Sequence, residues 1–201
     1  MKYISKSATI LTPEGVEVPY LANSDDFIIR TNKDTELRAK EYNDCVVVSI
    51  AHALDISYTK AHAFCKEFFS REDKQGVLGF HRIAYTNRER YKTIAEKYFG
   101  SKVLKRIETT SKYRNRCHWS GEMRSVARNM TLKTFLKTYP KGRFILAFND
   151  HAIAVIDGIV CGNGTATDAF RLRRRVGIAV EVSGLESRSR KSLCQAVKIQ
   201  R

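Results

Sequence analysis

The most continuous apolar segment of the chain lies near residue 50. The sequence "CVVVSIAHAL" at 45–54 is apolar at nearly every position, and Asn43 and Asp44 stand directly before it. A short polar side chain there can accept hydrogen bonds from the free amides of a first helical turn. The pattern therefore predicts a buried helix over 44–54, capped by Asn43 or Asp44. The three successive valines leave a buried strand as the alternative.

Apolar residues at helical spacing predict further helices. Residues 58–70 repeat apolar positions on one face, and residues 87–98 are amphipathic. Thr131 can cap a short helix that Pro140 and Gly142 would end. These helices place most of the helical structure in the first half of the chain.

Alternating and short apolar patterns predict strands, and most of them lie in the second half. Asp157-Gly158 is a strong signal for a two-residue hairpin between two of them. The predicted strands cover 7–11, 16–21, 26–31, 101–108, 143–148, 151–157, 159–163 and 173–182. The predicted fold class is α+β, with a helical N-terminal part and a buried central helix packed on a C-terminal antiparallel sheet.

Length and composition suit a single domain. The chain has 201 residues, of which 43% are hydrophobic, so it can build a substantial core. We expect one domain over 1–186 and a basic tail over 187–201. Residues 109–130 are polar, basic and without a clear period, which predicts an inserted loop.

The chain carries a formal net charge of +15, which favours an anionic partner such as nucleic acid, an acidic protein or an anionic membrane surface. Two basic clusters stand out, and Tyr113 and Trp119 lie in or near the first, a mixture that suits phosphate contact and base stacking. A simple solvated face is the alternative. The candidate binding residues are Lys102, Lys105, Arg106, Lys112, Arg114, Arg116, Arg171, Arg173, Arg174 and Arg175.

The five cysteines indicate free thiols rather than a disulfide framework. Their number is odd and their spacing irregular. Residues 1–20 lack a signal-peptide pattern and no segment is long enough to span a membrane, so we expect a cytoplasmic protein that is not secreted. Cys117, His118 and Cys161 lack a fourth ligand for zinc, and we expect no metal and no cofactor.

Cys45 is the candidate nucleophile. A thiol at a helix N-terminus meets the positive end of the helix dipole, which favours the reactive thiolate. Asp44 opposes this, so a basic partner is needed. His151, at the start of an apolar strand, can supply it if the strand end faces the helix N-terminus. The alternatives are a small core cysteine and an ordinary polar residue at a strand end.

These motifs resemble the papain-like cysteine peptidase fold. The capped cysteine in "NDC" and the later "GRFILAFNDHAIAVIDG" are most similar to small papain-like proteins carried by bacteriophages. Those proteins have Asn-Asp-Cys, then a Gly-Arg strand, then a His-Ala followed by Asp-Gly. The resemblance covers roughly 40–182 and implies that Cys45 is the nucleophile and His151 the general base and acid.

The sequence departs from that family in ways that affect the remaining site residues. No Gln precedes the cysteine in "RAKEY", so Asn43 is the candidate for the oxyanion site, together with the Cys45 backbone amide. Asp150 replaces a small residue before the histidine. The residue that orients His151 is predicted to be Asn163, which a one-residue bulge would bring onto the histidine face. Asp168 is the backup, and an ordinary turn residue is the alternative for Asn163.

The predicted function is therefore acyl transfer at an amide or thioester by a Cys-His dyad or triad. The enzyme would be a peptidase, isopeptidase or amidase, encoded by a phage, acting in the host cytoplasm on an acidic peptide or protein. The alternative is an inactive papain-like protein whose basic surface binds nucleic acid or an acidic partner. A virion component is a third possibility.

Overall fold

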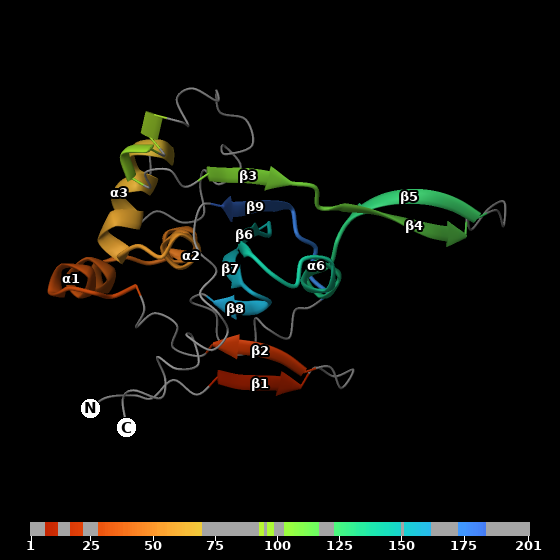
Figure 1. The fold of residues 1–201 in the computed structure, drawn as a ribbon, viewed down its shortest axis with the longest axis horizontal. Helices are drawn as coiled ribbons and strands as arrows, with labels where there is room; N and C mark the ends of the chain where they lie inside the picture. Colours follow the sequence, from red (N-terminus) through yellow and green to blue (C-terminus); the bar gives the residue numbers. More distant parts are fainter. Residues whose placement is uncertain are drawn as a thin grey trace.

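In the structure, a computed structural model, the helices α1 (Asn32–Lys40), α2 (Cys45–Leu54) and α3 (Tyr58–Phe69) lie on one side of a large sheet (Figure 1). A further helix is α6 (Leu132–Thr138), and residues 93–94 and 96–98 are also helical. The mixture confirms the α+β class. The residues described are 7–11, 17–21, 28–69, 93–94, 96–98, 103–116, 123–149, 151–161 and 173–183.

Seven strands form the main sheet in the order β1-β2-β8-β7-β6-β9-β3. All neighbouring pairs are antiparallel except β2 and β8, which are parallel through Tyr20 and Val160. The N-terminal strands therefore extend the C-terminal sheet at one edge. The bounds are β1 (Ser7–Leu11), β2 (Glu17–Leu21), β3 (Val103–Ile107), β6 (Arg143–Ala147), β7 (Ala152–Ile156), β8 (Ile159–Cys161) and β9 (Ile178–Ser183).

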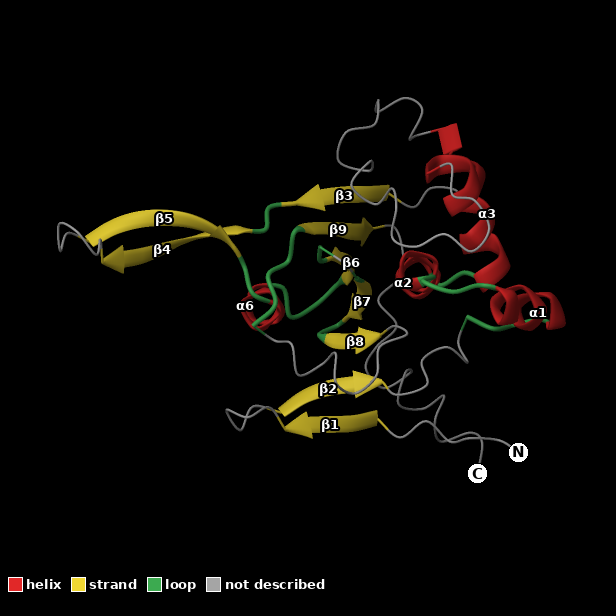
Figure 2. Ribbon diagram, turned by 180° about the vertical axis from the view of Figure 1, so that it is seen from behind, coloured by secondary structure: helices red, strands yellow, loops and turns green. Residues whose placement is uncertain are grey.

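The sheet separates two apolar cores. Because successive strand residues point to opposite faces, Ala154 packs in the core shared with α2 and α3, whereas Val155 packs in the core shared with α6. Phe135 of α6 meets Phe144 of β6 edge-on, with ring centroids 5.4 Å apart. Figure 2 shows α6 on the opposite side of the sheet from α1, α2 and α3.

Helix α2 is the centre of the larger core. All ten of its residues are buried, and Val47, Ile50 and Leu54 have no exposed surface. Burying each such side chain contributes about 1.5–3 kcal/mol. This confirms the predicted buried helix and excludes the strand alternative. Asp44 occupies the N-cap position, but its side chain makes no capping hydrogen bond, so that part of the prediction was wrong.

The segment before α2 differs from the prediction. Residues 28–31 of the expected 26–31 strand form a turn and a helix cap, and the polar residues that follow form α1. A capping box starts this helix, in which Thr31 accepts from the Asp34 amide and Asp34 accepts from the Thr31 amide. Helix α1 is polar nearly all round, so apolar periodicity could not reveal it.

The predicted loop over 109–130 was also wrong. Strands β4 (Thr110–Arg116) and β5 (Met123–Asn129) pair in register as an antiparallel hairpin with a sheet of their own. Their sequences are polar on both sides, so no apolar alternation marks them. The tip of the hairpin lies outside the described residues.

Other predicted elements are confirmed. The hairpin turn at Asp157-Gly158 joins β7 to β8, with a positive φ at both positions. Thr131 caps α6 by accepting from the Thr134 amide at 3.2 Å. Within the described residues, no helix is long and apolar enough to cross a membrane. The predicted tail over 187–201 and residues 87–92 of the predicted third helix lie outside the described part of the chain.

Candidate functional site

Cys45 is the first residue of α2 and is 4% exposed. The backbone there is fixed by the helix itself, because Val48 donates to the Asp44 carbonyl and the Ser49 hydroxyl donates to the Cys45 carbonyl at 2.6 Å. The thiol thus stands at the positive end of the helix dipole. It is a free cysteine, as the sequence predicted.

The Asp44 carboxylate is paired with one residue of α1 and one of α3. Its carboxylate accepts from the Tyr58 hydroxyl at 2.8 Å and lies 3.5 Å from the Arg38 guanidinium. Burial and the neighbouring Asp44 charge raise the pKa of Tyr58, which therefore stays a hydrogen-bond donor. The negative charge next to Cys45 is partly balanced by these contacts, which weakens its opposition to a thiolate.

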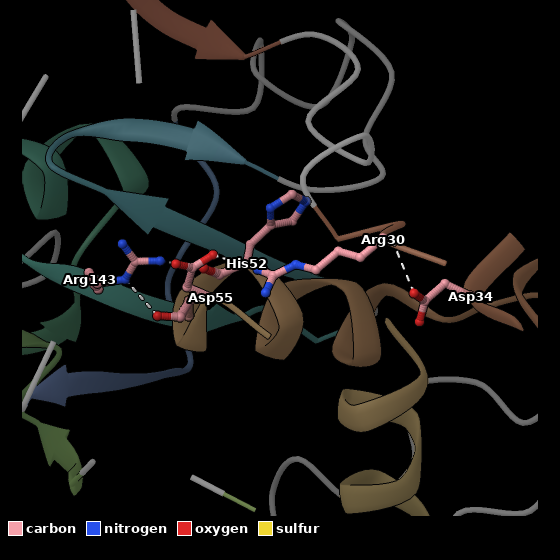
Figure 3. Close-up of polar contacts among 6 residues, drawn as sticks. Arg30, Asp34, His52, Asp55 and Arg143 are labelled. Carbon is pink, nitrogen blue, oxygen red and sulfur yellow. Dashed lines mark hydrogen bonds and ion pairs between the residues drawn. The ribbon is translucent and has the colours of Figure 1, made fainter. Parts of the chain in front are cut away.

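Hydrogen bonds at the C-terminal end of α2 hold the helix in its orientation. Arg143, the first residue of β6, donates to the His52 carbonyl at 2.6 Å and the Ala53 carbonyl at 2.7 Å (Figure 3). Its strand partner is Ile156, the last residue of β7. Helix α2 packs along β7. The ten residues of α2 span about 15 Å and the five residues of β7 span about 17 Å, so the two elements are of similar length. The N-terminal end of α2 therefore reaches the end of the sheet at which β7 begins.

His151 lies at that end of the sheet, one residue before β7. Its carbonyl accepts from the Phe148 amide at 2.8 Å, which closes the tight turn from β6 to β7. The imidazole is partly buried. Ala152 packs toward α2 and Ile153 toward α6, and His151 precedes them at the turn that joins β6 to β7. The turn that contains His151 and the N-terminal end of α2 thus lie toward the same end of the sheet, and the pairing of Cys45 with His151 stays a prediction.

Arg174 is a further member of this region. Burial lowers the pKa of its guanidinium, and a charge interaction with Cys45 opposes that shift, so the two groups are within electrostatic reach. The guanidinium also lies over the Phe148 ring, 4.9 Å from its centroid. The sequence analysis assigned Arg174 to an anion-binding surface. Its position beside Cys45 was not predicted, since no local pattern relates the two.

The loop that carries Arg174 is held on both sides. The Arg174 carbonyl accepts from the Leu132 amide at 2.9 Å, and the Val176 amide donates to Met130 at 2.9 Å. The Gly177 amide then donates to Ala147, the last residue of β6, also at 2.9 Å. These bonds fix the backbone of Arg174 next to the end of β6, near the turn that contains His151.

The other predicted catalytic residues have different outcomes. Asn43 is exposed and has a positive φ of 54°, which places it at the sharp turn before Asp44. Asn163 and Asp168 lie outside the described residues. The pairing of β7 with β8 continues without a bulge as far as Cys161, so the described part of the hairpin does not supply the bulge that the Asn163 prediction requires.

The described members of the predicted basic set belong to three segments, namely β3, β4 and the loop before β9. Lys105, Arg106 and Lys112 are exposed, and Arg114 and Arg116 belong to β4. Arg173 and Arg175 are exposed, and Arg175 donates to the Asn129 carbonyl at 2.7 Å. Lys102 and Arg171 lie outside the described residues.

The remaining histidines and cysteines of the described chain have structural surroundings. His62 contacts Glu41 at 3.1 Å, and both lie away from solvent. Cys161 is wholly buried, which raises its thiol pKa to about 12 despite the nearby charge of Arg143. Among the described residues no group of three or more His, Cys, Asp or Glu side chains is arranged to hold a metal ion. Cys117 and His118 lie outside them.

Comparison with protein-family models gave no match, and comparisons with curated proteins and with solved structures gave none either.

Proposed function

We propose that the chain is a papain-like cysteine hydrolase or acyltransferase acting on an amide or thioester bond. The observation that carries the proposal is a thiol at the N-terminus of a buried helix, with the Arg174 guanidinium within electrostatic reach of it. The helix dipole and Arg174 both stabilise negative charge on the Cys45 sulfur. The pairing of Asp44 with Arg38 and Tyr58 reduces the opposing charge.

In the proposed mechanism the Cys45 thiolate attacks the substrate carbonyl and forms a tetrahedral oxyanion. The Cys45 backbone amide and the exposed side chain of Asn43 are the nearest candidates to stabilise that oxyanion. His151, which holds the proton lost by the Cys45 thiol, gives it to the leaving amine or thiol as the carbonyl–leaving-group bond breaks, and the acyl group remains on Cys45 as a thioester. His151 then takes a proton from the incoming water or acceptor, which attacks the thioester and releases Cys45.

The proposed substrate is acidic close to the bond that reacts. Arg174 lies beside the nucleophile, and the exposed Arg173 precedes it on the same loop. A carboxylate on the substrate would be attracted to this pair, and the attraction would weaken with salt. An acidic peptide or protein is therefore a better candidate than a neutral one.

The test is the pH dependence of iodoacetamide alkylation, read cysteine by cysteine in peptides by mass spectrometry. We expect Cys45 to react with a midpoint well below 8.5, the approximate value for an ordinary thiol. The wholly buried Cys161 and Cys65 serve as internal controls that stay unmodified in the folded protein. A midpoint for Cys45 at or above about 8.5 would contradict an activated nucleophile.

Matched variants assign the cause of the activation. Arg174→Gln removes the cation beside Cys45 and should raise the alkylation midpoint. Arg173→Gln removes an exposed neighbour and should leave it in place. His151→Asn should change the midpoint if the imidazole contacts the thiol. Equal midpoints in the wild type and all three variants would mean that neither Arg174 nor His151 acts on Cys45.

A further inference from the structure

The β4–β5 hairpin stands apart from the main sheet. Its two strands pair only with each other, in a separate two-stranded sheet that extends beyond the end of β3 (Figures 1 and 2). An isolated two-stranded hairpin is marginally stable in water, because neither face buries apolar surface. A hairpin of this kind gains stability when a partner covers one of its faces.

Hydrogen bonds nevertheless hold the base of the hairpin in place. The Met130 amide donates to the Thr109 carbonyl at 2.6 Å, and both residues are buried. Glu108 accepts from the amide and hydroxyl of Thr110 at the first position of β4. Arg175 donates to the carbonyl of Asn129 at the last position of β5. The body therefore fixes the base of the hairpin, while Lys112, Met123, Ser125, Ala127 and Arg128 along its strands are exposed.

The charge of the two strands is of one sign. The two strands contain no Asp or Glu, while their basic residues are Lys112, Arg114, Arg116, Arg124 and Arg128. Like charges within a two-stranded hairpin repel one another and lower its stability further. This arrangement indicates an anionic partner rather than a packing role.

One face of the hairpin carries a regular row of cations. Positions 112, 114 and 116 alternate along β4, and their partners on β5 are Ala127, Ser125 and Met123. Lys112 and these three neutral partners are exposed, Met123 to 53%. By strand register, positions 112, 114 and 116 share one side of the hairpin with positions 123, 125 and 127, and we call these six positions the basic face.

The spacing and shape of this face fit a polyphosphate backbone. Alternate strand residues repeat every 6.8 Å or so, which gives evenly spaced positive charges over roughly 14 Å. Sequence-independent contact of Lys and Arg with phosphates supplies nearly all non-specific affinity for DNA. The major groove, about 12 Å wide, admits a two-stranded β-ribbon, and such ribbons are an established way of entering it.

We propose that the β4–β5 hairpin is an arm that binds duplex DNA, with its basic face against the phosphates bordering the major groove. Lys105 and Arg106, both exposed on the edge strand that leads into the arm, extend the cationic surface toward the body. The arm and Cys45 are separate features, so this binding does not depend on the proposed acyl-transfer activity.

The test compares two triple variants of the full chain. Lys112→Thr, Arg114→Thr and Arg116→Thr together remove the cationic row while keeping residues that favour strands. The control, Lys33→Gln, Lys40→Gln and Lys60→Gln, removes the same charge from exposed positions on α1 and α3. Binding to a labelled duplex DNA is measured by fluorescence anisotropy at several salt concentrations. Circular dichroism checks that both variants are folded.

We expect the arm variant to bind duplex DNA at least about tenfold more weakly at moderate salt. Its plot of log affinity against log salt should be shallower by about 2.7, from three lost contacts at about 0.9 each. The control should lose less than about threefold. Cys45→Ser should bind as the wild type does, which separates this result from the outcome for the proposed function.

Three outcomes would overturn the proposal. One is the absence of DNA binding by the wild type at low salt. Another is an equal loss in the arm and control variants, which would indicate attraction by net charge alone. The third is tighter binding of polyglutamate than of DNA at equal charge concentration, which would assign the arm to an acidic protein.

Discussion

At the C-terminal end of α2 the last carbonyls have a dedicated side-chain donor, whereas at the N-terminal end the N-cap side chain is used elsewhere. Arg143 reaches the His52 and Ala53 carbonyls from β6. Asp44, in the N-cap position, accepts instead from Tyr58. One end is thus closed by the protein's own side chains. The other keeps its dipole available to a negative charge on Cys45.

The difference shows how a single buried helix can serve two purposes. Fixing the C-terminal end holds the helix along β7, and Arg30 adds a second contact there by pairing with Asp55 at 2.6 Å (Figure 3). With one end fixed, the position of the thiol at the other end is set by the length of the helix. Stability and reactivity are therefore expected to respond to different substitutions.

The largest effect on stability should come from Arg143→Met. The variant keeps the aliphatic stem but leaves two buried carbonyls without their charged donor, which should cost about 2–4 kcal/mol. Urea unfolding measures the loss. Lys141→Met, at an exposed position nearby, should change stability by less than about 0.5 kcal/mol.

This substitution also tests whether the two ends act separately. The alkylation midpoint of Cys45 in Arg143→Met should equal that of the wild type under conditions where the variant is folded. A displaced midpoint would mean that the ends of α2 are coupled.

A smaller effect is expected from Asp34→Asn. Burial opposes ionisation of Asp34, but hydrogen bonds from Thr59, Thr31 and the Arg30 amide prevail and lower its pKa to about 2. A folded-state pKa below the unfolded value near 3.8 stabilises the protein above pH 4 or so, and this contribution disappears as the pH falls toward 2. At neutral pH the variant should lose about 2 kcal/mol.

The pH dependence distinguishes this cause from simple loss of packing. The difference in unfolding free energy between the wild type and Asp34→Asn should shrink between about pH 4 and pH 2. Glu36→Gln, exposed on the same helix, should show neither the loss nor the pH dependence. A difference that stays constant down to pH 2 would contradict the role of the charge.

The smallest effect on stability, about 1 kcal/mol, is expected from Asp44→Asn, since Tyr58 still has an oxygen to which it can donate. Its effect on Cys45 should be clearer. Removing a negative charge beside the thiol favours the thiolate, so the alkylation midpoint should move to lower pH. Asp55→Asn at the other end of α2 should leave the midpoint unchanged, and a shift of equal size there would argue against a local effect.

The parts of the fold that the sequence predicted have strong local signals. The buried run of α2, the cap of α6 at Thr131 and the turn at Asp157-Gly158 each combine an apolar pattern with a residue suited to one backbone conformation. Such signals depend on neighbouring residues, so they can be interpreted without the tertiary structure.

The elements that the sequence analysis did not predict lack a periodic pattern of apolar residues. Helix α1 and the β4–β5 hairpin are mostly polar, and their few apolar residues do not repeat with the period of 3.6 or 2 on which the predictions depend. The capping box at Thr31 and Asp34 was the available signal for α1. For the segment 26–31, two isoleucines suggested a strand, but only Ile28 is buried there, and it packs against the helices.

The candidate site was only partly accessible to sequence reasoning. Cys45 and His151 were chosen from their local surroundings, and their pairing as nucleophile and base stays a prediction. Arg174 was identified as basic but assigned to the surface, because its proximity to Cys45 depends on the loop before β9 and on the packing of α2 against the sheet. Relations of that kind are tertiary, and the spacing of residues along the chain does not encode them visibly.

The hydrogen bond between Thr109 and Met130 has a consequence for how this chain can change. It brings the entry and exit of the hairpin together, so the intervening segment forms its own two-stranded sheet without interrupting any strand pair of the main sheet. Lengthening such a segment costs little, about 0.6 kcal/mol of closure entropy for each doubling. The arm can therefore be lengthened, shortened or exchanged by insertion and deletion, while the body and its cysteine-bearing helix retain their own sequence constraints.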